Sequence, residues 1–137
     1  MQVSALDHVV LKVADVEEAL RFYTQVLGMQ PVRLDRWRAG EVPFPSVRVN
    51  GATIIDLVAA DESAGASPAR VNMDHFCLVI DGELAPALAE LERHGVAIER
   101  GPGVRFGARG GGRSAYVRDP AGNLIELRTY AEVGPAA

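Results

Sequence analysis

The chain has 137 residues, of which 48% are hydrophobic and 23% charged, with 14 basic and 18 acidic residues and a net charge of −4. This size and composition predict one soluble globular domain whose core needs neither disulfides nor a structural metal. The negative charge and the lack of a basic stripe argue against a nucleic-acid partner, because duplex binding relies on clustered Lys and Arg side chains.

The chain also lacks the sequence features of a membrane or secreted protein. No apolar run reaches the roughly 18 residues that a bilayer span requires, so no membrane partner is expected. Asp7 and His8 interrupt the start, where a secretory apolar segment would lie. The single cysteine, Cys77, excludes an internal disulfide and is typical of a reducing compartment. We therefore expect a cytoplasmic protein with Cys77 buried as a small hydrophobe.

The first half of the chain reads as a strand, a helix and three further strands. LDHVVLKV predicts a strand over residues 6–13. Asp15 and Glu18 form a capping box that starts a helix running to about residue 27. Gly28 then suits the left-handed backbone conformation that commonly ends an α-helix. The remaining strands are predicted near residues 30–36, 44–50 and 53–59.

The second half repeats this order after a predicted linker, residues 61–70. MDHFCLVI, residues 73–80, is the matching strand, and a helix is expected over about residues 83–94. Three strands are predicted near residues 96–100, 114–118 and 123–129. Between them, residues 101–113 contain six glycines and predict a mobile loop, and residues 131–137 predict a frayed tail.

The two halves align as copies of one unit. Residues 6–33 superpose on residues 73–100 at an offset of 67, which pairs His8 with His75. GATIIDLV and GNLIELR align at an offset of 70, which pairs Asp56 with Glu126. Each half therefore carries one histidine and one carboxylate at equivalent places.

Strand alternation predicts that these four side chains leave the apolar, helix-covered side of their strands. Two imidazoles and two carboxylates suit a borderline divalent ion, so the sequence predicts one metal site in a shared concavity. Its expected ligands are His8, Asp56, His75 and Glu126, and its expected ion is Zn, Ni, Co, Mn or Fe(II). Taken singly, each histidine is also explained as an ordinary strand residue bonded to the preceding aspartate. Asp56 is one methylene shorter than Glu126 and can fall short of the ion or bind it through water.

The motifs LDHVVLKVADVEEALRFYTQVLGM and YVRDPAGNLIEL resemble the vicinal oxygen chelate superfamily, which includes glyoxalase I, extradiol dioxygenases, fosfomycin-modifying enzymes and bleomycin-resistance proteins. The resemblance covers about residues 5–130. It implies a single α+β domain of two βαβββ modules, at about residues 5–60 and 71–130, that form a half-open barrel-like cleft. It also implies a divalent metal held by His8, His75 and Glu126, with Asp56 in place of a glyoxalase I glutamate, and a homodimer.

Three main functions and one weaker option fit this resemblance. In a glyoxalase-type lyase or isomerase, a small substrate chelates the metal through two vicinal oxygens. Glu126 or Asp56 is then the catalytic base that moves a proton between adjacent carbons. The main alternative is extradiol ring cleavage at Fe(II) held by the two histidines and Glu126 alone. A thiol transferase is a weaker option. The third reading is a protein that binds a small planar ligand without converting it.

Four residues are candidates for substrate binding. Arg109 and Arg113 lie in the glycine-rich segment, together with Arg105, and these arginines could close over an anionic substrate, although a solvated turn explains them equally well. Tyr116 lies on the strand that leads to DPAGN and could line the pocket. Trp37 either lines the cleft or covers its rim.

Overall fold

The computed structural model describes residues 5–60, 75–107 and 109–132, together with Gln2 and Met73. The chain divides into two compact units, Met1–Ala66 and Ser67–Ala137. The predicted linker, residues 61–70, lies outside the described residues, as do residues 133–137 of the predicted tail. Within the described part, no helix is both long and apolar enough to cross a membrane.

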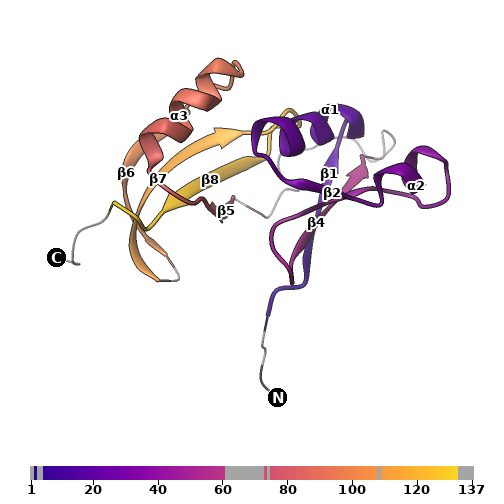
Figure 1. The fold of residues 1–137 in the computed structure, drawn as a ribbon, viewed down its shortest axis with the longest axis horizontal. Helices are drawn as coiled ribbons and strands as arrows, with labels where there is room; N and C mark the ends of the chain where they lie inside the picture. Colours follow the sequence, from indigo (N-terminus) through magenta and orange to yellow (C-terminus); the bar gives the residue numbers. More distant parts are fainter. Residues whose placement is uncertain (1, 3–4, 61–72, 74, 108, 133–137) are drawn as a thin grey trace. The chain divides into compact units, whose positions relative to one another are not determined.

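The first unit contains a four-stranded mixed sheet in the order β1-β4-β3-β2 (Figure 1). β1 runs parallel to β4, and the other neighbours are antiparallel. Its elements are β1 (His8–Val13), α1 (Val16–Arg21), a π-helix (Phe22–Val26), β2 (Gln30–Val32), α2 (Leu34–Arg38), β3 (Ser46–Arg48) and β4 (Ile54–Ala59).

The second unit repeats this topology with a sheet in the order β5-β8-β7-β6. β5 is again parallel to β8, and the other pairs are antiparallel. Its elements are β5 (Phe76–Val79), α3 (Leu84–Arg93), β6 (Arg100–Gly107), β7 (Gly110–Arg118) and β8 (Leu124–Thr129). The predicted α+β class and the duplicated strand–helix–strand–strand–strand order are therefore confirmed, and neither sheet closes on itself.

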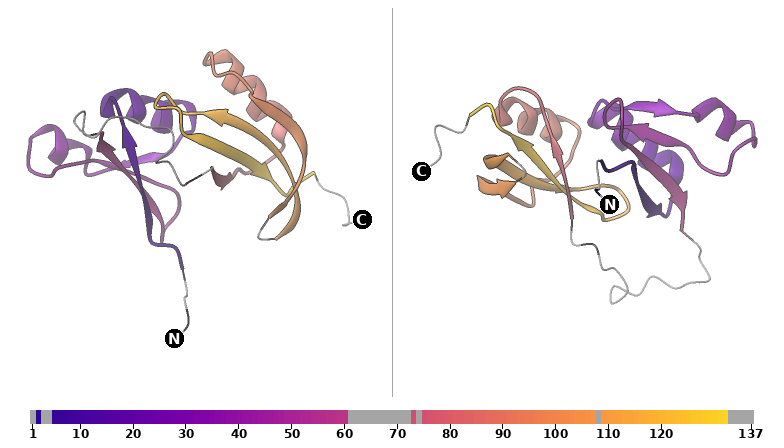
Figure 2. Two further views of the ribbon diagram at one scale, coloured as in Figure 1. Left: turned by 180° about the vertical axis from the view of Figure 1, so that it is seen from behind. Right: turned by 90° about the horizontal axis from the view of Figure 1, so that it is seen from below.

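Each unit has its own apolar core beneath its helices. In the first unit, strand alternation buries Leu11 and Val13 of β1 while His8, Val10 and Lys12 are exposed. In the second unit, α3 lies along one face of the sheet (Figure 2) and buries Leu84 and Leu91. The opposite face of each sheet is thereby left for polar side chains.

The first predicted helix changes its winding midway. Asp15 is confirmed as the N-cap of this helix, because the Glu18 amide donates to Asp15 Oδ1 at 3.0 Å. The α-helix ends at Arg21, however, and the chain continues to Val26 as a π-helix. This wider turn buries both Phe22 and Tyr23, whose rings meet edge to face at 5.2 Å. Burial of two adjacent aromatic rings explains the departure from regular helical winding.

The strand predicted over residues 30–36 is shorter than expected. β2 ends at Val32, and Arg33, with φ of 61°, turns the chain into α2. The Arg33 guanidinium stacks on Phe44 at 4.9 Å from the ring centroid, which supports this left-handed turn. α2 is tied to α1 by two hydrogen bonds from Arg38 to Glu17, at 3.0 and 2.9 Å.

The mobile loop predicted over residues 101–113 is wrong, because most of this segment forms the β6–β7 hairpin. Gly101 and Gly112 of this segment mark places of close packing. A Cβ on Gly101 would lie 2.7 Å from the Ser114 carbonyl oxygen of the paired strand. A Cβ on Gly112 would lie 3.0 Å from Arg128 Nη1. The missing side chains therefore make room for the neighbouring strand and for a buried arginine.

Candidate functional site

The first unit places His8 and Asp56 on neighbouring parallel strands. Asp56 of β4 pairs with Val10 of β1, and His8 lies two residues earlier on the same exposed side. His8 Nε2 lies 4.0 Å from Asp56 Oδ2. Asp56 is buried among apolar neighbours, with 7% of its surface exposed.

A second carboxylate and a hydroxyl orient this pair. His8 Nδ1 donates to Asp7 Oδ2 at 2.8 Å, which directs Nε2 toward Asp56. The hydrogen bond to Asp7 raises the pKa of His8, and the charge of Asp56 acts in the same direction. The Ser46 hydroxyl donates to Asp56 Oδ1 at 2.6 Å, leaving Oδ2 to face the imidazole.

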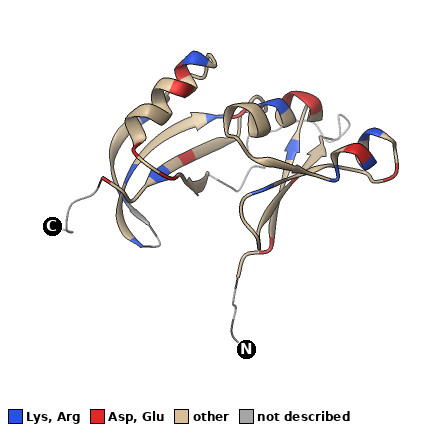
Figure 3. Cartoon of the chain, viewed as in Figure 1, with Lys and Arg blue, Asp and Glu red and all other residues tan. Residues whose placement is uncertain are grey.

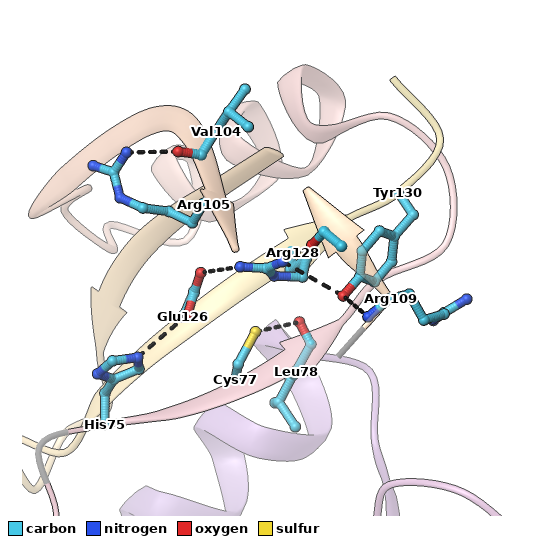
Figure 4. A network of polar contacts seen from close by, with 10 residues as sticks. His75, Cys77, Leu78, Val104, Arg105, Arg109, Glu126, Arg128 and Tyr130 are labelled. Atoms are coloured by element: carbon cyan, nitrogen blue, oxygen red, sulfur yellow. Dashed lines mark hydrogen bonds and ion pairs between the residues drawn. The ribbon is translucent and has the colours of Figure 1, made fainter. Parts of the chain in front are cut away.

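The second unit builds the same pair at the start of β5. His75 lies directly before this strand, and its Nε2 is 3.3 Å from Oε2 of Glu126 on β8 (Figure 4). Arg128 Nη2 donates to the other oxygen, Oε1, at 3.0 Å. Glu126 and Arg128 stand out as charged positions within an otherwise uncharged strand (Figure 3).

Glu126 is held in its ionised form despite its burial. Only 5% of its surface is exposed, and this burial alone would raise its pKa. The Ser114 hydroxyl and the Arg128 guanidinium outweigh burial, so the pKa of Glu126 lies below its usual range. An ionised carboxylate with one oxygen facing an imidazole is the form that a metal ion requires.

The two pairs share one design. In each, a protein donor holds one carboxylate oxygen and the other oxygen faces a histidine Nε2. Both nitrogen–oxygen separations are below about 4.2 Å, the sum of two metal–ligand bonds of about 2.1 Å, so each pair can reach one ion. Within the described part of either unit, no three His, Cys, Asp or Glu side chains form a metal-binding group. Each unit thus supplies two donors that suit a borderline divalent ion.

Arg128 is positioned by packing as well as by charge. Its side chain is 2% exposed and lies across Gly112 of β7, in the space that a Cβ would occupy. Nη1 donates to the Gly110 carbonyl oxygen at 3.3 Å and lies 3.4 Å from the Tyr130 hydroxyl. The orientation of Glu126 therefore depends on a glycine in the neighbouring strand.

Gly112→Ala is expected to lower the free energy of unfolding by about 1–3 kcal/mol, the usual range for overpacking. The new methyl group would lie 3.0–3.1 Å from three atoms of the buried Arg128 side chain. Urea denaturation measures the loss. Gly51→Ala is the matched control, because no atom lies within 4 Å of its Cβ position. Equal stability changes in the two variants would contradict this packing role.

Of the four predicted substrate-binding residues, Tyr116 lies beside the His75–Glu126 pair. It is 6% exposed, pairs in register with Glu126, and its ring meets His75 edge-on at 5.4 Å. Arg109 stacks on Tyr130 at 4.4 Å, at the far end of the Arg128 network. The Arg109 amide also donates to the Tyr130 hydroxyl, which lowers the pKa of that phenol.

The other two predicted residues lie elsewhere. Arg113 is on the α3-covered face, 3.7 Å from Glu132, where it helps to line a pocket of about 290 Å³ with α3 residues. The structure therefore does not bring Arg113 together with Glu126. Trp37 lies half-buried on α2 in the first unit.

Sequence reasoning missed two of the residues that shape the pairs and misplaced a third. Arg128 and Ser46 were not predicted as site residues, although Arg128 follows Glu126 by two positions and must share its strand face. The prediction that Cys77 is buried is wrong, because the thiol is exposed. Cys77 lies on the edge strand β5 in register with Glu126, on the same side as His75.

Comparison with known proteins identifies the family. The model of the glyoxalase/bleomycin resistance protein/dioxygenase superfamily matches residues 5–127, and the chain therefore belongs to this superfamily. A glyoxalase domain-containing protein, RDO1, of Mycosarcoma maydis is 33% identical over 96% of this chain and 72% of its own. Virulence protein STM3117 of Salmonella typhimurium is 32% identical over 95% of this chain and 87% of its own.

Solved structures share the fold. An integron cassette protein from V. cholerae superposes with a TM-score of 0.77 and 37% identity, covering 96% of this chain and 98% of its own. Lactoylglutathione lyase from Agrobacterium tumefaciens has a TM-score of 0.67 at 24% identity, over 95% of this chain and 96% of its own, a likeness of fold alone. Among the curated relatives, a catechol-2,3-dioxygenase of Bacillus subtilis is 29% identical over 89% of this chain and 39% of its own.

Proposed function

We propose that this chain is a metal-dependent enzyme of the superfamily, a glyoxalase I-like lyase or isomerase whose small substrate presents two vicinal oxygens. His8, Asp56, His75 and Glu126 are the proposed ligands of one divalent ion. The observation that supports this proposal is the repeated pair, in which a tethered carboxylate presents one oxygen to a histidine Nε2. A homodimer, by analogy with the superfamily, and a cytoplasmic location, from the single cysteine, are part of the same proposal.

The chain's own residues supply the proton chemistry in this proposal. A bound divalent ion would act as a Lewis acid that makes the C–H bond beside a chelated oxygen acidic. Glu126, ionised through Ser114 and Arg128, would accept that proton at Oε2 once this oxygen is released from the ion and would return it to the adjacent carbon, with Asp56 Oδ2 as the alternative acceptor. Tyr116, buried beside His75, would exclude water from this side of the reacting carbons.

One feature favours ring cleavage as a second candidate. Asp56 Oδ2 is 4.0 Å from His8, whereas Glu126 Oε2 is 3.3 Å from His75, so the shorter carboxylate is the more distant donor. Without Asp56, the donor set becomes the two-histidine, one-carboxylate triad of non-haem Fe(II) oxygenases. The catechol-2,3-dioxygenase relative supports this reading.

Metal analysis followed by two assays tests the proposal. Protein prepared with and without oxygen is expected to retain about one divalent ion per chain. When loaded with nickel, cobalt or zinc, it should convert the hemithioacetal of methylglyoxal and glutathione. Oxygen uptake on catechol by the iron form would favour the second candidate instead. Protein that retains no metal yet binds a ligand tightly would contradict both enzymes and indicate a binding role.

A further inference from the structure

The face of the second sheet that carries Glu126 continues as a row of side chains across four strands. Cys77, Glu126, Tyr116 and Arg100 are neighbours in register on β5, β8, β7 and β6. The Arg100 guanidinium lies 4.4 Å above the Tyr116 ring, and the same ring meets His75 at 5.4 Å. One aromatic ring therefore separates the cation of Arg100 from the His75–Glu126 pair.

Arg105 lies on β6, the strand that carries Arg100, and its side chain approaches this row. It pairs with Gly112, whose Cβ direction faces Arg128, so its side chain leaves the same face of the sheet. A Cβ on Gly103 would lie 3.0 Å from Arg105 Nη1, which shows that the guanidinium lies back over Gly103, toward Arg100. Nη1 also donates to the Val104 carbonyl oxygen at 2.9 Å (Figure 4).

Neither guanidinium has a carboxylate partner within the described residues. Among the described residues of the second unit, ion pairs join other groups, namely Arg113 to Glu132, Arg118 to Glu99, and Glu126 to His75 and Arg128. Arg100 and Arg105 are both exposed, so a ligand can reach them. Guanidinium groups donate in a planar fork that matches the two oxygens of a carboxylate.

We propose that Arg100 and Arg105 bind a carboxylate of the substrate, which assigns the substrate to small molecules that carry a carboxylate in addition to two vicinal oxygens. This inference rests on the proposed function, because the vicinal oxygens are the part that the metal would chelate. The inference adds that the proposed metal ion and the two arginines bind opposite ends of one substrate molecule. Arg128, which is committed to Glu126, takes no part in binding the carboxylate.

The affinities of three matched catechols test this assignment without an activity assay. Catechol, 2,3-dihydroxybenzoate and 3,4-dihydroxybenzoate all present vicinal oxygens, but only the last two carry a carboxylate. Titration calorimetry of the cobalt-loaded protein under nitrogen is expected to show at least one carboxylate binding about tenfold more tightly than catechol. Arg105→Gln and Arg100→Gln should each remove most of that preference while leaving the affinity for catechol unchanged. Arg93→Gln, at the exposed end of α3, is the matched control.

The outcomes separate this inference from the proposed function. Catechol binding with no preference for either carboxylate, or a preference that survives when Arg100→Gln and Arg105→Gln are combined, would overturn the carboxylate site alone. Failure to retain metal would overturn the proposed function and this inference with it, whereas metal-loaded protein that binds none of the three catechols would overturn this inference alone. Benzoate and inorganic phosphate serve as competitors, and displacement by phosphate but not by benzoate would also contradict the assignment.

Discussion

Replacing His75 with alanine is expected to reduce the affinity for a divalent metal by more than about a hundredfold, the upper end of the range for changes in outer-shell partners of a metal ligand. His75 Nε2 lies 3.3 Å from Glu126 Oε2, so the substitution removes one donor and leaves the other without its neighbour. Competition against a chromophoric chelator measures the change. The zinc and nickel affinities should fall together, because the imidazole suits both ions.

The third histidine supplies the control for this experiment. His94 ends α3 as its C-terminal cap, is exposed, and lies outside both proposed donor pairs. His94→Ala should therefore keep the metal affinity of the unsubstituted protein. Circular dichroism should show both variants folded, since the His75 side chain is 31% exposed and contributes little burial. Unchanged metal affinity in His75→Ala would remove this residue from the proposed site.

Replacing Arg128 with methionine is expected to lower the free energy of unfolding of the metal-free protein by about 3–5 kcal/mol, because it leaves a buried carboxylate without its cation. The side chains of Arg128 and Glu126 are 2% and 6% exposed, so solvent does little to compensate. Urea denaturation followed by circular dichroism measures the loss. Tryptophan fluorescence is unsuitable, because the single tryptophan, Trp37, lies in the first unit and Arg128 lies in the sheet of the second.

The pH dependence of this loss follows from Glu126. Its pKa is lowered in the folded protein, so the stability that it contributes is present above the unfolded pKa and disappears as the pH falls through the folded pKa. The difference between the two proteins should therefore shrink on acidification. Glu126→Gln added to Arg128→Met should recover stability at neutral pH, because it removes the unpaired charge. A double variant as unstable as Arg128→Met would contradict this account.

The features of the fold that follow from the alternation of side chains along a β-strand were predictable from the sequence. Alternation in LDHVVLKV separates His8 from Leu11 and Val13, and the structure confirms this division. The internal repeat predicted that His75 and Glu126 would recur where His8 and Asp56 stand, and the equivalent strand pairs are present in both units. That the four donors hold one ion stays a prediction.

The departures arise where packing overrides local pattern. Glycine-rich residues 101–113 have the composition of a loop, yet the bare backbone is needed where Arg128 lies across Gly112. The π-helix depends on burying the rings of Phe22 and Tyr23 together, which no helical spacing encodes. The same holds for the donors that orient the carboxylates. Ser46 reaches Asp56 only through the register of β3 with β4.

The tethering of one oxygen in each carboxylate also bears on selection among ions. Because Ser46 donates to Oδ1 of Asp56 and Arg128 donates to Oε1 of Glu126, the other oxygen of each carboxylate is the more available donor for a cation. Calcium collects about six to eight oxygen ligands, often with carboxylates gripping through both atoms, and has little use for imidazole nitrogen. In the proposed site, carboxylates held in this way beside imidazoles would therefore favour a smaller, nitrogen-tolerant ion over calcium.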